Sequence, residues 1–234
     1  MIGSFNLNEG KKTLGEQAYE SIREDILTVR LKPGQTIYES DFAKMLNMSR
    51  TPIREAVHTL LVEGLIEVLP QRGMKIALIS DKKVEETRFV RESLEISALQ
   101  TVIRHWDAEQ RDYQLLRREL RNNLDMQLSA AEQNDAVQFL QADEQFHRLL
   151  LAASGNETLI AIVSQMRGHL NRVRVLSLQE LANIRSLIAE HEVLLSAIDA
   201  GDEMKATTTL RNHLSRLTDD IQVVKNKYPS YFTE

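Results

Sequence analysis

The sequence predicts a mainly α-helical protein in two parts. Residues 1–79 are expected to form three helices and a β-hairpin, and residues 80–234 an all-α bundle of about six helices. Only 9 Gly and 4 Pro occur in 234 residues, too few for the many tight turns of a β-rich protein. The hydrophobic pattern also changes near Ser80 from a period of 2 to a helical period of 3.6, which predicts a domain boundary there.

The composition excludes several classes of protein. A chain that is 42% hydrophobic and 27% charged is typical of folded proteins rather than disordered ones. The longest apolar runs, residues 149–153 and 159–163, are far shorter than the roughly 20 residues of a membrane helix. No signal peptide is visible, and the absence of cysteine excludes disulfides and thiolate sites. We therefore expect a cytoplasmic protein with no membrane partner.

The first part of the chain alternates helical stripes with clear stop signals. A stripe of apolar residues begins at Leu14 and ends before Pro33 and Gly34. Ser49 is placed to cap a later helix that has Pro52 in its first turn, where proline is tolerated. The expected elements are helices over residues 14–29, 40–46 and 49–64, then strands over residues 65–69 and 74–78.

The third of these helices has one apolar and one polar face. Its apolar residues follow the i, i+3, i+4, i+7 spacing and are expected in the core; they are Ile53, Ala56, Val57, Leu60 and Leu61. Arg50, Thr51 and Arg54 therefore face outward near the helix N-terminus, where arginines can bind guanine edges in a major groove. The alternative is an ordinary surface helix with two arginines. The hairpin that follows, with Arg72 and Gly73 at its tip, favours a winged helix-turn-helix.

These residues resemble a known family of DNA-binding proteins. The motif Ser49-Arg50-Thr51-Pro52-Ile53-Arg54-Glu55-Ala56, then Leu60, Glu63-Gly64-Leu65-Ile66 and Arg72-Gly73, is similar to the winged helix of GntR-type bacterial transcription regulators. The resemblance covers about residues 13–78. It implies a double-stranded DNA operator as partner and DNA contacts from Ser49, Arg50, Thr51, Arg54, Arg72 and Gly73. The chain has Ser40 where relatives often have an arginine, which puts a DNA contact from that helix in doubt.

The second part of the chain is continuously helical and places polar groups on apolar stripes. Helices are expected near residues 82–105, 108–132, 135–153, 157–177, 180–199 and 203–225. Asp143 and His147, spaced i, i+4, share one face of a helix, and His191 and His213 lie on apolar stripes of two others. A buried carboxylate is costly unless it is paired or bound to a metal. These four groups could hold zinc, nickel or manganese, or they could be ordinary hydrogen-bonded core residues.

This part resembles the FCD ligand-binding domain of the FadR subfamily of GntR regulators over about residues 82–222. The matching residues are Arg91-x-x-x-Glu95, Asp143-x-x-x-His147, Asn156, Glu190-His191 and His213-Leu214. The resemblance implies one divalent metal ion held by Asp143, His147, His191 and His213, and a small carboxylate effector that completes its coordination. Arg91, His169 and Arg172 are the candidate effector-binding residues.

Three functions remain open at this point. The first is a metabolite-responsive transcription regulator, expected to act as a homodimeric repressor and not as an enzyme. The second is a metalloenzyme that uses the Asp/His cluster, although the sequence offers no clear general base beside it. The third is a constitutive DNA-binding protein with a structural metal. The winged helix favours the first and third over the second.

Overall fold

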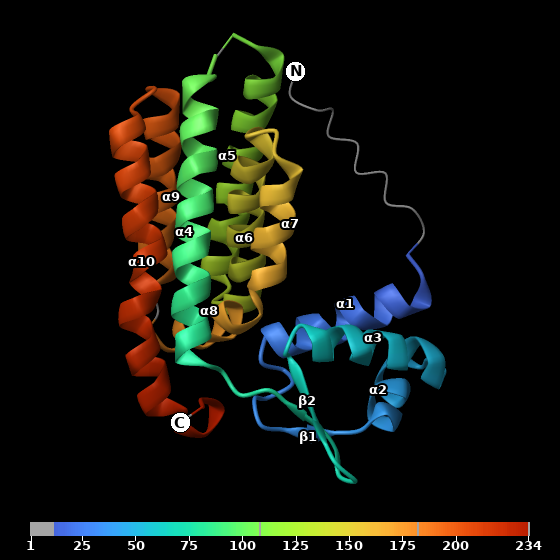
Figure 1. Ribbon diagram of the computed structural model, residues 1–234. Coiled ribbons are helices and arrows are strands. Elements are labelled where there is room, and N and C mark those ends of the chain that lie inside the picture. Colours follow the sequence, from blue (N-terminus) through green and yellow to red (C-terminus); the bar gives the residue numbers. More distant parts are fainter. Residues whose placement is uncertain (1–11, 108, 182, 234) are drawn as a thin grey trace.

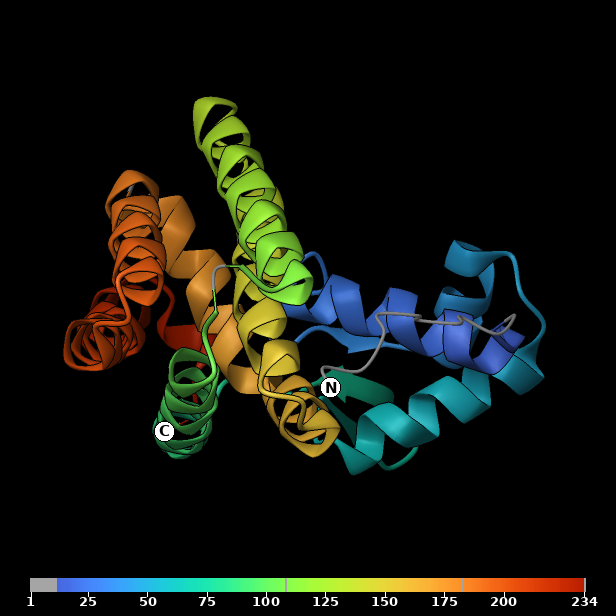
Figure 2. The same ribbon diagram turned by 90° about the horizontal axis from the view of Figure 1, so that it is seen from above.

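The computed structural model describes residues 12–107, 109–181 and 183–233 of the chain. Its N-terminal part contains α1 (Leu14–Leu27), β1 (Thr36–Ile37), α2 (Glu39–Leu46), α3 (Arg50–Val62), β2 (Ile66–Leu69) and β3 (Gly73–Ile76). Its C-terminal part contains α4 (Asp81–Arg104), α5 (Arg111–Glu132), α6 (Ala136–Ala153), α7 (Glu157–Met166), α8 (Gly168–Leu181), α9 (Ile184–Asp199), α10 (Glu203–Lys227) and the short 3₁₀ helix η1 (Pro229–Tyr231). Figure 1 shows a helical bundle with the N-terminal part packed at one end, and Figure 2 shows that part extending to one side of the bundle.

The N-terminal part is a winged helix, as predicted. Thr13 caps α1 through a capping box with Glu16, and Asn47 turns the chain between α2 and α3 with a positive φ of 51°. The hairpin β2–β3 is antiparallel, and β1 adds a third strand that the sequence did not predict. Two residues are too few to show a period of 2, so β1 is recognisable only through its pairing with β3. The core of this part includes Ala18, Ile22, Phe42, Ile53 and Leu60.

The C-terminal part is all-α, but the single helix expected over residues 157–177 is divided. The part of the chain that the structure describes has seven α-helices after Ser80 instead of six, because α7 ends at Met166 and α8 begins at Gly168. A Cβ atom on Gly168 would lie 2.7 Å from the Cδ2 atom of Leu65. Because Gly168 has no Cβ atom, the start of α8 lies closer to the winged helix than any other residue at this position would permit. None of the described helices combines the length and apolar character needed to cross a membrane.

Two of the predicted effector-binding residues, His169 and Arg172, lie on α8 at the junction between the two parts. Arg172 is fully buried and donates from Nη1 to the carbonyl of Ala77 at 2.5 Å. His169 Nδ1 accepts from Arg172 Nη2 at 2.9 Å and from the Ser80 amide at 3.2 Å. These contacts place both side chains against the linker between β3 and α4, and His169 also lines a cavity at this junction.

We expect His169 to make the protein less stable at acidic pH. Burial, helped by the charges of Arg172 and Lys83, lowers the pKa of His169 from 6.5 to about 3. Between these two values the unfolded chain binds a proton that the folded chain does not, so stability falls as the pH decreases from 6.5 towards 3. The loss between pH 7.5 and pH 5 from this group is about 2 kcal/mol.

Urea unfolding of the wild type and of His169→Gln at both pH values measures this effect. Glutamine keeps an acceptor for the Ser80 amide but does not titrate, so the variant should lose less stability on acidification. Equal losses in the two proteins would show that His169 is not the group responsible.

Candidate metal centre and nucleic-acid interface

Four buried side chains from three helices converge inside the bundle. Asp143 and His147 come from α6, His191 from α9 and His213 from α10. One ligand atom from each of them lies within 4.8 Å of those of the other three. Asp143, His147 and His191 are fully buried, and His213 is 7% exposed. The structure thus brings together the four residues that the sequence singled out as possible metal ligands.

Each histidine of the cluster is oriented through its Nδ1 atom. His191 Nδ1 lies 2.8 Å from Gln127 Oε1, and His213 Nδ1 lies 2.9 Å from Glu190 Oε2. His147 Nδ1 is 2.7 Å from Glu95 Oε2. Since Gln127 Oε1 and Glu190 Oε2 are acceptors, the Nδ1 atoms of His191 and His213 carry the protons and their Nε2 lone pairs point into the cluster, while the Glu95 carboxylate favours the same tautomer in His147.

The interior of the cluster has the donor set and the unsatisfied atoms that suit a cation. The Nε2 atoms of His147 and His213 are 3.3 Å apart, so two lone pairs face each other. His191 Nε2 and Asp143 Oδ1 are buried without a hydrogen-bond partner, and they lie 3.8 Å from each other. A divalent cation would satisfy all four groups at once, and a set of three imidazoles and one carboxylate fits zinc, nickel or manganese.

Electrostatics keep these ligands in the forms that bind a metal. Burial lowers the pKa of His191 well below its ordinary value, and it also lowers the pKa of His147 despite the nearby Glu95. Burial alone would raise the pKa of Asp143, but Arg174 and the three histidines hold that pKa well below its usual range. At neutral pH the imidazoles of His147 and His191 are therefore neutral and the Asp143 carboxylate is ionised.

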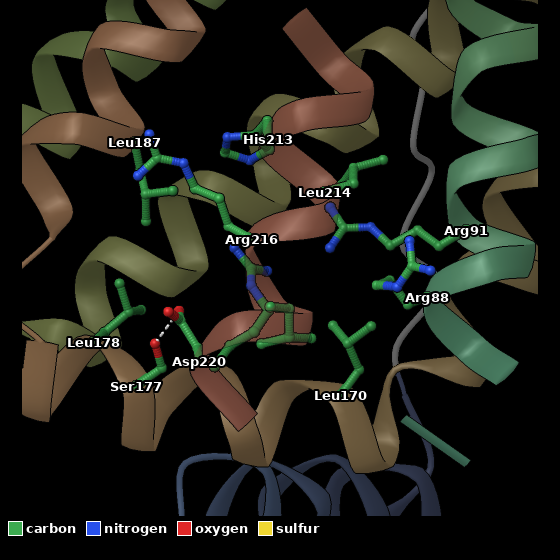
Figure 3. Close-up of a pocket in the computed structure, with 12 residues that line it drawn as sticks. Arg88, Arg91, Leu170, Ser177, Leu178, Leu187, His213, Leu214, Arg216 and Asp220 are labelled. Carbon is green, nitrogen blue, oxygen red and sulfur yellow. Dashed lines mark hydrogen bonds between the residues drawn. The ribbon is translucent and has the colours of Figure 1, made fainter. Parts of the chain in front are cut away.

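A cavity of about 40 Å³ lies beside His213 and is surrounded by arginines. Figure 3 shows Arg88 and Arg91 reaching it from α4, with His213 and Arg216 on α10. Arg174, which also lines the cavity, donates to Asp143 Oδ2 at 2.5 Å, and Arg91 donates to Glu95 Oε1 at 2.5 Å. Arg91 Nη2 and Arg174 Nη1 are both buried without a partner. An anionic group beside the cluster could accept from these two nitrogens.

Only one of the three predicted effector residues, Arg91, lines this cavity, and Arg174 was not predicted. The sequence also assigned no role to Gln127, which orients His191. A signal for Gln127 was present, because it continues the buried stripe of α5 at helical spacing. No comparable pattern distinguishes Arg174 from Arg172.

The predicted nucleic-acid interface is an exposed surface of the winged helix. Arg50 and Arg54 are exposed on the first turns of α3, whereas Ile53 and Leu60 are buried. Arg54 donates from Nε to Glu39 Oε2 at 3.0 Å, which leaves the terminal guanidinium nitrogens free of that bond. Ser49 and Thr51 are exposed beside these arginines, so one end of α3 presents two cations and two hydroxyls.

The tip of the hairpin projects from the body of the protein, as Figure 1 shows. Arg72 is exposed there, and Gly73 follows it with a φ of 90°. A Cβ atom on Gly73 would lie 2.6 Å from Tyr38 Cε1, so this glycine is required for packing within the protein. Of the two predicted wing contacts, only Arg72 has a side chain that can reach a ligand.

Comparisons of the sequence with known proteins agree with this architecture. Residues 14–76 match the model of bacterial regulatory proteins of the gntR family, and residues 86–216 match the FCD domain. An HTH-type transcriptional regulator in an unstable DNA locus of Streptomyces ambofaciens is 31% identical over 94% of this chain and 90% of its own length. The HTH-type transcriptional repressor RspR of Escherichia coli is 26% identical over 94% of each chain.

Solved structures share the fold at lower sequence identity. The Escherichia coli protein McbR/YncC matches with a TM-score of 0.78 at 20% identity, over 93% of this chain and 100% of its own. A GntR regulator from Rhodococcus matches with a TM-score of 0.73 at 18% identity, over 92% and 98% of the two chains. With a gntR-type winged helix at its N-terminus and an FCD domain over most of the remainder, the chain belongs to the GntR family of bacterial transcription regulators.

Proposed function

We propose that this regulator is a cytoplasmic, homodimeric repressor whose operator affinity responds to a small carboxylate metabolite. Residues 1–79 form the DNA-binding unit and residues 80–234 the effector-binding and dimerisation unit. One observation supports this most directly: the Asp/His cluster lies beside a cavity with two unfilled guanidinium donors. A site built only to hold a structural metal would have no use for these donors.

In this proposal the winged helix reads DNA with the exposed end of α3. Arg50 and Arg54 contact base edges in the major groove, with Ser49 and Thr51 beside them, and Arg72 contacts phosphate or the minor groove from the wing. One winged helix reads only a few base pairs. Two copies on a near-palindromic operator supply the specificity that a genome requires.

The helical domain would hold one divalent metal ion through Asp143, His147, His191 and His213. Bound there, the ion supplies a positive charge and open coordination positions for a carboxylate oxygen. The effector carboxylate would also accept from Arg91 Nη2 and Arg174 Nη1. The effector can change DNA affinity only by binding two arrangements of the protein differently, with a typical coupling of about 1–3 kcal/mol.

Substitution of the two arginines on α3 should weaken specific DNA binding. Arg50→Ala and Arg54→Ala each remove a bidentate base contact, so each should cost about 1–3 kcal/mol and relax specificity at one position. Arg72→Ala should weaken binding to selected and shuffled sequences alike. Operator sites selected from a random DNA library supply the probes, and affinities are compared at fixed salt.

Arg121→Ala is the matched control, since this arginine is 58% exposed on α5 and far along the chain from the winged helix. It should leave DNA affinity unchanged. Full retention of operator affinity in both Arg50→Ala and Arg54→Ala would place the DNA-reading surface elsewhere.

Loss of a cluster histidine should abolish metal binding while the winged helix stays folded. Wild-type protein incubated with zinc, nickel or manganese should retain one ion per chain by elemental analysis, and His191→Ala or His213→Ala should not. Glu95→Gln, which removes the carboxylate charge that both His147 and Arg91 face, should lower metal affinity by about 10–100-fold. The exposed His105 provides the control variant His105→Ala, which should bind as the wild type does. Wild-type protein that remains metal-free would leave the histidines as core residues.

Effector binding should depend on the two arginines with unfilled donors. Metal-loaded protein is screened by thermal shift against a panel of small mono- and dicarboxylates, because a ligand at 100 times its Kd stabilises the native state by about 2.7 kcal/mol. Arg91→Met and Arg174→Met should each weaken the best ligand by about 10–100-fold, the worth of a charge-assisted hydrogen bond. Arg211→Met, outside the cavity, should have no effect. If no carboxylate stabilises the loaded protein, the metal has a structural role only.

A further inference from the structure

The linker between the two domains, residues Ala77–Ser80, is bonded almost entirely to the helical domain. It lies outside both family matches, which cover residues 14–76 and 86–216. Its first amide, that of Ala77, donates back to the winged helix at Leu65. Four further hydrogen bonds of its backbone all go to the helical domain and its C-terminal tail; the partners are Arg172, Tyr231, Thr233 and His169. A linker with these hydrogen bonds is an ordered segment and not a flexible one.

Two of these bonds come from the extreme C-terminal tail, which returns to the linker after α10. The Ile79 amide donates to the Tyr231 carbonyl at 2.8 Å, and the Thr233 amide donates to the Ile79 carbonyl at 2.9 Å. Ile79 and Phe232 thereby form a parallel β-bridge. In Figure 1 the C-terminus lies next to the segment that leads into α4. Tail and linker, separated by about the whole helical domain in sequence, are joined in space.

Apolar burial and a polar anchor hold the tail in place. Phe232 is 4% exposed and Ile79 is fully buried in one cluster with residues of α8 and α10. Tyr228 donates from its hydroxyl to Glu180 Oε1 at 2.5 Å, and Lys227 also pairs with Glu180. The tail is therefore bound to the same helix, α8, that grips the linker from the other side through His169 and Arg172.

The hydrogen bond from Arg172 to the Ala77 carbonyl of the linker depends on the position of α8. Its three guanidinium nitrogens donate to the carbonyls of Gly168 and Ala77 and to His169 Nδ1, and the described residues offer it no carboxylate partner. Burial lowers the pKa of Arg172 to about 10, but the group remains charged at neutral pH. Losing the Ala77 carbonyl would leave part of a buried cation without an acceptor, which is strongly unfavourable.

We propose that tail residues 228–233 act as a strap that fixes the linker against α8, so that the winged helix has one defined orientation relative to the helical domain. The strap itself depends only on the contacts above. Its regulatory role, which is to pass movements of α8 to the winged helix, rests on the proposed function.

The strap is tested by measuring linker protection and domain orientation in a chain that ends at Lys227. Hydrogen exchange of the Ile79 amide should be about tenfold faster without the tail, because its acceptor and its apolar cover are gone. The Ala77 amide, bonded within the winged helix, and the amides of α6 should exchange as in the wild type, which verifies that both domains remain folded.

Spin labels report the orientation directly. The chain has no cysteine, so Met45→Cys on α2 and Met204→Cys on α10 place two labels on side chains that are 53% and 78% exposed. The distance distribution should be narrow in the full chain and broad in the truncated one. Phe232→Ala, which keeps the tail backbone, should broaden it partly, and Ser230→Ala at an exposed position of the same tail should not. The proposal would be overturned if Ile79 exchange and the distance distribution were unchanged in both the truncated chain and Phe232→Ala.

Zinc chloride added to the labelled proteins separates the strap from the proposed function. If metal binding is coupled to the winged helix, zinc shifts the distance in the full chain, and this defined shift is lost without the tail. A full chain that does not respond, together with a truncated chain that still broadens, would reject the coupling and leave the strap intact. A truncated chain that shows the same defined shift as the full chain would reject the regulatory role of the strap.

Discussion

The buried carboxylate of Asp143 is the constraint around which the helical domain is organised. An ionised group in the centre of a bundle is tolerated only if opposite charges and hydrogen-bond donors surround it. Here Arg174 supplies one ion pair from α8, and histidines from α6, α9 and α10 surround the rest. Four of the seven α-helices that the structure describes after Ser80 thus surround one charge, and the apolar core packs around this arrangement.

Because Arg174 is the direct counterion of Asp143, the charge of the cluster and the position of α8 depend on each other. A cation bound by Asp143 would weaken the attraction between the carboxylate and the guanidinium, since both positive charges share one negative charge. Arg174 would then be available to an anionic ligand in the adjacent cavity. In the proposed function, an effector that is both metal-bound and paired with Arg174 would therefore act on α8 without any contact with the linker.

Local spacing predicts the fold class and the inward faces of the helices that carry the cluster, whereas the convergence of its four residues is expected only from the resemblance to FCD domains. The inward faces of α3 and α6 can be identified from the i, i+3, i+4 pattern alone, and the structure agrees with both. The break between α7 and α8 could not be predicted, since it depends on the approach of Leu65 to Gly168 across about 100 residues of sequence. The role of Arg174 could not be predicted for a similar reason. Arg172 and Arg174 are two positions apart on one helix, so their side chains point about 200° apart, and only tertiary contacts show which of them faces the cavity.

Because Arg172 and Arg174 lie on opposite sides of α8, this helix connects the Asp/His cluster to the linker. Arg174 faces the Asp143 carboxylate, and Arg172 faces the Ala77 carbonyl of the linker. Both side chains are held in place, since Arg174 is ion-paired in the interior and Arg172 is a buried cation bound by three acceptors. A rotation or shift of α8 that frees Arg174 must strain the bonds of Arg172 at the same time. Packed interiors of this kind change between discrete arrangements and do not deform gradually, so α8 is suited to convert a change of charge at the cluster into a change of domain orientation.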